Sequence, residues 1–347
     1  MIHAEPPSVD TLGDRRVILH IGTHKTGTKA LQGMLALNRD VLESVGIYIP
    51  YTGHVQLTES YESTGHHALA WDLLCTPSKG ILNEMLEELR SARPTTVIVS
   101  SEEIHPLHHH PEAMQQLVDG FASLGYRTVA VIYLRAQDRY AESLFQQHIR
   151  DGRSPSFEEH LGTILQHGRT EVSTARFEFL YSRLLDALAG SFGASNVVAR
   201  PYLPNRGGEN IHRDFLRIVS MLHGSISRSL TTTTSNASFT LGGLLEQLYR
   251  NLRPGSEIAR PGLEEFACKV LPDFNLAFLD DRFLLLTREE TLAFLERFAA
   301  DNTAVAERSS ARIPFITEAD VSKSDDRFWA ESAAHRRLFS AAMAAWS

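Results

Sequence analysis

The segment from residue 16 to residue 38 constrains the fold more than any other part of the chain. An almost wholly apolar run over 16–21 leads into a loop that contains Gly22 and Gly27. Apolar residues then recur at helical spacing over 28–38. A strand that is apolar along its whole length fits a parallel sheet covered on both faces. The segment therefore predicts a buried strand, a glycine loop and a helix, which is the first unit of an α/β fold.

The rest of the chain continues this alternation of strands and helices. Further apolar runs predict strands over residues 95–99, 127–134 and 196–199. Helical spacing of apolar residues predicts helices over residues 66–74, 80–92, 111–124, 137–150, 209–222, 239–252, 288–301 and 334–346. Alternating strands and helices indicate a central parallel sheet flanked by helices. We therefore expect a flexible arm over 1–15 and a single α/β domain over 16–347, with a mostly helical C-terminal half.

Composition and charge exclude several classes of protein. The 347 residues carry 34 Lys and Arg against 42 Asp and Glu, a net charge of −8. A chain this acidic lacks the basic surface that bulk nucleic-acid binding requires, although it can hold one small basic pocket. No run approaches the roughly 18 apolar residues of a membrane span, and the polar N-terminus has no signal-peptide core. With only Cys75 and Cys268, we expect a cytoplasmic protein. The sequence does not indicate an oligomeric state.

The loop between the first strand and its helix has the composition of an anion-binding site. Backbone N–H groups at a helix N-terminus can face an anion, and the helix dipole favours negative charge there. Glycines allow the backbone to approach a ligand closely, a lysine adds positive charge, and hydroxyl groups add hydrogen-bond donors. We therefore assign the phosphate contacts to Gly22, Thr23, His24, Lys25, Thr26, Gly27, Thr28 and Lys29.

The order of residues in this loop separates it from a nucleotide triphosphate loop. The two glycines have the G-x4-G spacing of the Walker A motif, which continues with Lys and then Ser or Thr. Here Thr28 and Lys29 follow Gly27 in the reverse order, and Lys25 precedes Gly27 by two residues. This arrangement indicates an ammonium group over the first phosphate rather than at the far end of a triphosphate.

The full segment over 21–32 reads Ile-Gly-Thr-His-Lys-Thr-Gly-Thr-Lys-Ala-Leu-Gln. It resembles the 5′-phosphosulfate loop of bacterial sulfotransferases that use 3′-phosphoadenosine 5′-phosphosulfate (PAPS), which reads Ile-Gly-x-x-Lys-Thr-Gly-Thr-Thr-x-Leu-Gln. The departure is Lys29, where the family usually has a second Thr. The resemblance implies a P-loop NTPase-like three-layer sandwich, PAPS as co-substrate, 3′,5′-ADP (PAP) as product and no required metal.

A second motif further along the chain matches the same family. The family's 3′-phosphate site consists of an Arg at the end of a strand and a Ser eight residues later, in the following helix. Arg135 follows the predicted strand over 127–134, and Ser143 stands at that spacing. A guanidinium offers paired hydrogen bonds to a phosphate, and a hydroxyl adds another donor. Such a clamp suits PAPS, whereas a kinase or GTPase does not need one.

Sulfuryl transfer to a hydroxyl or amine requires a cation near the leaving phosphate and a base for the acceptor's proton. The resemblance implies that Lys25 is the cation and that the base is a Glu or a His. Glu102 follows the second predicted strand, and His66 and His67 follow a polar loop over 50–65 in which we expect the acceptor to be recognised. The base is therefore Glu102, His66 or His67, and we expect a carbohydrate or other small-molecule acceptor.

Two other functions fit a glycine loop, namely an ATP-dependent P-loop kinase and a non-catalytic nucleotide-binding protein. The missing Gly-Lys-Ser/Thr order disfavours the kinase. The histidine-rich run over 105–110 invites a metal site, but prolines place it in an irregular connection without the fixed geometry that a metal needs. We therefore expect no functional metal.

Overall fold

The structure is a computed structural model that describes residues 15–23, 25–58, 61–62, 64–75, 80–172, 175–202, 211–224, 230–232, 239–281, 285–308 and 326–347. The chain forms two compact units, which we describe one at a time. The first comprises Met1–Arg135, Tyr181–Asn236 and Asn302–Ile313, and the second comprises Ala136–Leu180, Ala237–Asp301 and Pro314–Ser347. The predicted arm over 1–15 lies outside the described residues except for Arg15, and the single domain over 16–347 stays a prediction.

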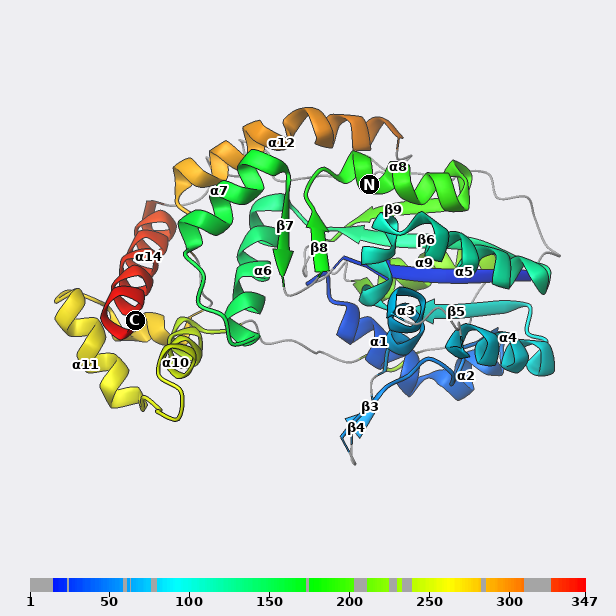
Figure 1. The fold of residues 1–347 in the computed structure, drawn as a ribbon, viewed down its shortest axis with the longest axis horizontal. Coiled ribbons are helices and arrows are strands. Elements are labelled where there is room, and N and C mark those ends of the chain that lie inside the picture. The colour runs from blue at the N-terminus through cyan, green and yellow to red at the C-terminus, as the bar shows by residue number, and fades with distance from the viewer. Residues whose placement is uncertain are drawn as a thin grey trace. The chain divides into compact units, whose positions relative to one another are not determined.

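A parallel sheet forms the centre of the first unit (Figure 1). Its strands lie in the order β2-β5-β1-β6-β9, and every neighbouring pair is parallel. Their bounds are β1 (Arg15–Gly22), β2 (Ile47–Tyr48), β5 (Thr96–Ser100), β6 (Tyr126–Leu134) and β9 (Val197–Pro201). The sheet confirms the predicted α/β class, and it places β1 in the middle of the sheet.

Helices cover both faces of this sheet, because its strands are apolar on both sides. On one face, Ile18 and its neighbours Ile98 and Val129 share a core with α1 (Thr28–Leu37) and α9 (Ile211–His223). The alternate residues Val17 and Leu19 are equally buried. Helices α5 (Pro111–Ser123) and α8 (Tyr181–Phe192) pack against β6.

The remaining elements of the first unit are short. Their bounds are α2 (Arg39–Glu43), β3 (Gln56–Thr58), β4 (Tyr61–Glu62), α3 (His67–Cys75), α4 (Gly80–Ala92), η1 (Glu102–His109) and η2 (Ala194–Asn196). Strands β3 and β4 form a separate antiparallel pair. The 3-10 helix η1 occupies the histidine-rich segment for which the sequence predicted an irregular connection.

The second unit is built mainly from helices, as predicted for the C-terminal half. Its elements are α6 (Gln137–Arg150), α7 (Phe157–His167), β7 (Arg169–Val172), β8 (Ala175–Glu178), α10 (Leu241–Leu252), α11 (Arg260–Val270), η3 (Leu276–Asp280), α12 (Arg288–Arg308), of which residues to Asp301 belong here, and α14 (Asp326–Trp346). Phe145 anchors an aromatic core, with ring centroids 4.8 Å from Phe157 and 5.4 Å from Phe339. Strands β7 and β8 form an antiparallel hairpin.

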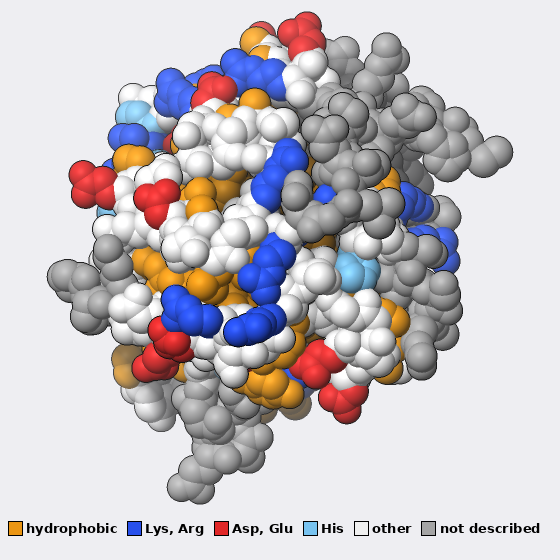
Figure 2. All heavy atoms as spheres, turned by 90° about the vertical axis from the view of Figure 1, so that its right-hand side faces the viewer, with side chains coloured by type: hydrophobic (Ala, Val, Ile, Leu, Met, Phe, Trp, Pro, Cys, Tyr) orange, Lys and Arg blue, Asp and Glu red, His pale blue; other side chains and the backbone are white. Residues whose placement is uncertain are grey.

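The surface carries charges of both signs. Figure 2 shows one face of the molecule, on which Lys and Arg side chains and Asp and Glu side chains both occur, with apolar side chains between them. Within the described ranges, no helix has the length and apolar character needed to cross a bilayer. The expectations of a cytoplasmic location and of no nucleic-acid partner stay predictions.

Candidate functional site

The candidate site lies at the carboxyl ends of three neighbouring strands of the first unit. Gly22 ends β1, Ser101 and Glu102 follow β5, and Arg135 follows β6. In an open parallel sheet, ligands bind at this edge, where the connections from two neighbouring strands run in opposite directions. From β1 the chain passes to β2 on one side, and from β5 it passes to β6 on the other, so the topology brings the glycine loop, Glu102 and Arg135 to one edge.

The glycine loop is tied to the sheet through its own hydroxyl groups. Thr23 Oγ1 donates to the carbonyl oxygen of Tyr133 at 2.7 Å, and Thr26 Oγ1 donates to the Thr23 carbonyl oxygen at 2.6 Å. Lys25 has φ 68° and Gly27 has φ 77°, both in the left-handed region. A left-handed lysine is uncommon and costs free energy. The loop is therefore a fixed, tightly turned segment, and His24 within it lies outside the described residues.

Helix α1 begins directly at this loop and has no side-chain cap. Gly27 occupies the N-cap position and offers no side chain to accept hydrogen bonds from the first turn. Thr28 is 4% exposed, and its Oγ1 has no hydrogen-bond partner among the residues that the structure describes. Lys29 is exposed on the same turn. Because the N–H groups of a first helical turn have no intrahelical acceptor, this helix start can accept an anion.

Arg135 reaches the loop from the end of β6. Its Nη1 donates to the Lys25 carbonyl oxygen at 2.8 Å, and its guanidinium carbon lies 5.8 Å from the ring centroid of Tyr202. Ser143 lies on α6 in the second unit. The structure thus brings Arg135 to the glycine loop, while the pairing of Arg135 with Ser143 stays a prediction.

Glu102 lies against the loop where Gly22, which has no side chain, leaves room for it. A Cβ atom on Gly22 would stand 2.4 Å from Thr28 Oγ1 and 3.3 Å from Glu102 Cβ. On its other side, Glu102 Oε2 accepts a hydrogen bond from Gln32 Nε2 at 2.9 Å and lies 3.9 Å from His67 Nδ1. The structure therefore brings Glu102 and His67 together beside the start of α1.

His66 and His67 are neighbours in sequence but lie in different surroundings. His66 is 1% exposed, its Nδ1 accepts a hydrogen bond from Ser100 N at 3.1 Å, and its Nε2 lies 3.1 Å from the Pro50 carbonyl oxygen, to which it donates. Burial, and to a lesser extent the neighbouring His54, lower the pKa of His66 to about 3. Both ring nitrogens are engaged, so His66 joins the segment at Pro50 to the end of β5.

His67 lies one residue further on, at the start of α3, and its side chain is partly exposed. Its Nδ1 lies 2.8 Å from Ser101 Oγ, which also accepts a hydrogen bond from Glu103 N. The ring stacks on Trp71, with centroids 6.0 Å apart and planes at 30°. Trp71 is 40% exposed, and its Nε1 donates to Glu103 Oε2 at 3.2 Å. Next to Glu102 there is thus an aromatic surface in a fixed orientation.

The polar loop over 50–65 is anchored at its start by Glu88 of α4. Glu88 accepts hydrogen bonds from Tyr48 Oη and Tyr51 N at 2.8 Å and from Thr52 N at 2.9 Å. Burial by itself raises the pKa of Glu88, but these hydrogen bonds outweigh burial, and the pKa lies below its usual value. Residues 59, 60 and 63 of the loop lie outside the described residues.

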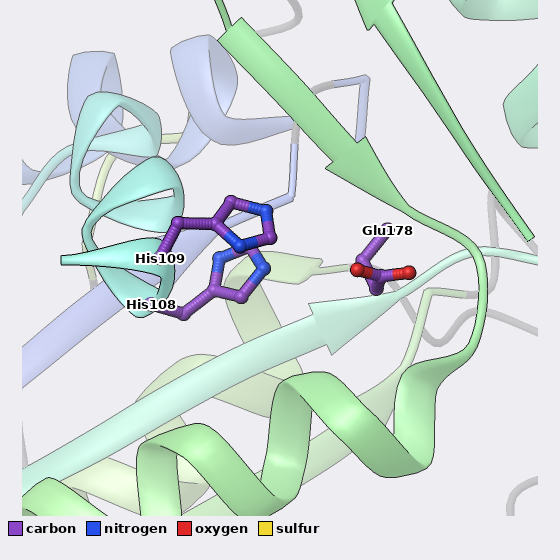
Figure 3. Close-up of side chains that lie close together, drawn as sticks. All are labelled: His108, His109 and Glu178. Carbon is purple, nitrogen blue, oxygen red and sulfur yellow. The ribbon is translucent and has the colours of Figure 1, made fainter. Parts of the chain in front are cut away.

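The histidine-rich segment is folded as η1. Figure 3 shows the rings of His108 and His109 side by side at the end of η1, with centroids 3.7 Å apart, and it also labels Glu178 of β8, which belongs to the second unit. His108 Nδ1 lies 2.6 Å from the carbonyl oxygen of His105. The expectation that the protein needs no metal stays a prediction.

Several residues of this edge were not singled out from the sequence. They are Gln32, Trp71, Tyr202 and His20. Gln32 closes the motif over 21–32, and its helical spacing from Thr28 was the available signal. His20 is buried in β1, with Nδ1 2.8 Å from Ser100 Oγ, and burial lowers its pKa to about 4 despite the opposing charge of Glu102. No sequence pattern distinguishes it from an ordinary strand residue.

No family model matches the chain, and no curated protein matches it. Among solved structures, the chain is similar to one described as the crystal structure of a sulfotransferase from Alicyclobacillus acidocaldarius. The two share 20% sequence identity, and the alignment covers 69% of this chain and 94% of the other, with a TM-score of 0.40. An overlap this loose does not indicate the activity of the protein.

Proposed function

We propose that the protein is a PAPS-dependent sulfotransferase that moves the sulfuryl group to a hydroxyl or amine of a carbohydrate or small-molecule acceptor. One observation carries this proposal. Gly22 lies against two side chains, namely Thr28 in the first turn of α1, which has no side-chain cap, and Glu102, whose Cβ faces Gly22. An anion site and a base side by side match the two needs of sulfuryl transfer, which are to hold the donor's phosphate and to accept the acceptor's proton.

The donor would bind through its two phosphate-bearing ends. The N–H groups at the start of α1 suit the 5′-phosphosulfate, with Lys25 neutralising charge on the leaving phosphate. Arg135 follows β6 and contacts the Lys25 carbonyl oxygen. Arg135 and Ser143 would hold the 3′-phosphate, as the resemblance implies, and the chemistry of guanidinium and hydroxyl groups suits that ligand.

The transfer itself is a direct in-line displacement at sulfur. The acceptor oxygen or nitrogen forms a bond to sulfur, while the bond between sulfur and the bridging phosphate oxygen breaks. The electron pair of that bond leaves with the 5′-phosphate of PAP, whose charge Lys25 offsets. The proton of the acceptor passes to the base. The products are PAP, the sulfated acceptor and one proton, and no metal enters the balance.

Glu102 is the base in this proposal. His66 has both ring nitrogens engaged by the backbone and is buried, so it is poorly suited to reach an acceptor. The Glu102 side chain faces Gly22 of the loop through its Cβ, and the other histidine candidate, His67, lies beside the Glu102 carboxylate. The acceptor would lie over His67 and the exposed face of Trp71, where an aromatic surface meets polar groups, as in many small-molecule sites.

The experiment that tests this function measures PAP release from PAPS with a panel of sugar and phenol acceptors. Wild-type protein should release PAP in an acceptor-dependent manner. Glu102→Gln should bind PAP as wild type does, yet lose turnover by about 10²- to 10⁴-fold, the usual contribution of a general base. Glu112→Gln, at an exposed position on α5, is the matched control. Mg-ATP turnover without any PAP binding would reject the proposal in favour of a kinase.

A further inference from the structure

The candidate base is held by a side chain from the helix that begins at the phosphate loop. Gln32 lies one helical turn after Thr28 on α1, so the two side chains share a face of the helix. Gln32 is 1% exposed, and its Nε2 donates to Glu102 Oε2 at 2.9 Å. The helix whose first turn forms the anion site therefore also holds the carboxylate.

The amide of Gln32 lies in a space that a glycine leaves open. A Cβ atom on Gly65 would stand 2.5 Å from Gln32 Nε2 and 2.7 Å from His67 Cε1. Because those distances are too short for real atoms, any larger residue at position 65 would displace the amide or the ring. The Gln32 side chain is therefore confined between Gly65 and Glu102, and its Nε2 amide group has little freedom to turn away from the Glu102 carboxylate.

This contact leaves the second carboxylate oxygen available. Glu102 Oε2 receives the Gln32 amide and faces His67 Nδ1 at 3.9 Å. Within the part of the chain that the structure describes, Glu102 Oε1 has no hydrogen-bond partner, and the side chain keeps 12% of its surface exposed. A hydrogen bond to one oxygen fixes the carboxylate plane, while the other oxygen remains free to accept a proton.

We propose that Gln32 is a positioning residue, which orients the Glu102 carboxylate relative to the donor bound at the start of α1. This inference rests on the proposed function and deepens it. A single rigid helix sets both the anion site and the base, so the acceptor's proton and the sulfur are presented in a fixed relation. Rigid placement of reacting groups is a major source of rate enhancement.

The test replaces Gln32 by a residue of similar volume that has no hydrogen-bond donor in its side chain. Gln32→Met should lower kcat by roughly 10- to 100-fold, as loss of a hydrogen bond to a charged group predicts. The KM for PAPS and the Kd of PAP should not change, because the loop itself is untouched. Gln32→Asn, whose amide is one methylene short of Glu102, should lose kcat in the same way, and it provides a second variant if Gln32→Met does not fold. The control is Gln115→Met, at an exposed position on α5 where Gln115 pairs with Asp119.

A double-mutant cycle separates positioning from a merely structural role. In the Glu102→Gln background, Gln32→Met should cause no further loss of kcat, because its effect acts through the carboxylate. Three results would overturn the positioning role while leaving the proposed function intact. The first is a wild-type kcat in both Gln32→Met and Gln32→Asn, the second is an equal loss of kcat from Gln32→Met in the wild-type and Glu102→Gln backgrounds, and the third is a raised KM for PAPS. A wild-type protein that neither binds PAP nor releases it from PAPS would reject the proposed function, and the positioning role with it.

Discussion

Two regions at the end of the central sheet use their polar atoms in opposite ways. In the buried region below the site, His66 gives both ring nitrogens to the backbone. His20 lies in the same region, where its Nδ1 is 2.8 Å from Ser100 Oγ, while its Nε2 is buried without a hydrogen-bond partner among the described residues. Burial lowers the pKa of His66 to about 3 and that of His20 to about 4. These histidines are neutral at ordinary pH, and they tie strands and loops together.

At the rim of the site, which consists of the glycine loop, the first turn of α1 and Glu102, some polar atoms have no hydrogen-bond partner in the described part of the chain. Thr28 Oγ1 is buried without a hydrogen bond, and Glu102 Oε1 has none either. The start of α1 has no side-chain cap. Unmet hydrogen-bonding capacity is costly when buried, so a ligand is the natural partner for it. The ring nitrogens of His66 are thus engaged by the backbone, whereas Thr28 Oγ1 and Glu102 Oε1 have no such partner among the described residues.

Replacing Lys25, the proposed cation, should have the largest effect of the substitutions that follow. Lys25→Ala should lower kcat by about 10²- to 10³-fold, the cost of removing one group that stabilises developing charge. Thermal unfolding should change little, because the Lys25 side chain is only half-buried. Steady-state kinetics with PAPS checks this outcome, with Lys269→Ala, an exposed position on α11, as the control. A kcat that fell no further than in the control would show that Lys25 does not offset the charge of the leaving phosphate.

A substitution at the boundary of the two regions should affect both stability and binding. Gly22→Ala places a Cβ atom 2.4 Å from Thr28 Oγ1 and 3.3 Å from Glu102 Cβ. Such overpacking costs about 1–3 kcal/mol in the free energy of unfolding, and the displaced loop should weaken PAP binding. Urea unfolding and calorimetric titration measure the two effects. Gly190→Ala on α8 has no atom within 4 Å of the new Cβ; it should leave PAP binding unchanged and raise the free energy of unfolding by at most about 1 kcal/mol through helix propensity. Equal behaviour of the two variants would mean that the loop adjusts without cost.

The buried region should respond to pH rather than to substrate. The unfolded chain binds a proton at His66 near pH 6.5, whereas the folded protein binds it only near pH 3. The unfolded state therefore holds more protons in this window, and the free energy of unfolding falls as the pH falls from 6.5 toward 3. One such group contributes at most about 1.4 kcal/mol per pH unit. His66→Gln should make this dependence shallower, as urea unfolding between pH 4 and 7 would show.

The control for that experiment is His110→Gln, at an exposed position after η1. It should retain the wild-type slope of unfolding free energy against pH. A slope in His66→Gln that equals the wild-type slope would contradict the assignment of His66 to the buried region.

The sheet was predictable because its strands are apolar on both faces and its first loop is rich in glycine. The predicted strand over 127–134 corresponds to β6, and the predicted helix over 80–92 has the bounds of α4. Strand β2 has two residues and therefore too little pattern to detect. The hairpin of β7 and β8 was missed for a related reason, since each of its strands has four residues.

The candidate site was predictable only to the level of single strand ends. The position of Glu102 after a strand placed it at the edge of the sheet, as the topology of parallel strands requires. The sequence could not separate His66 from His67, because the difference depends on backbone groups at Ser100 and Pro50 that are distant in sequence. The contact between Gln32 and Glu102 spans seventy positions and depends on tertiary packing.

The most direct test of the whole account is the melting temperature of the protein with PAP and with AMP. A ligand at a hundred times its Kd adds about 2.7 kcal/mol to the free energy of unfolding, which raises the melting temperature by roughly 5 °C. If the rim holds a 5′-phosphate and Arg135 with Ser143 holds a 3′-phosphate, PAP should produce this rise and AMP a much smaller one. Equal rises with PAP and AMP would contradict the 3′-phosphate clamp, and no rise with PAP would contradict the central claim that the rim binds the sulfuryl donor.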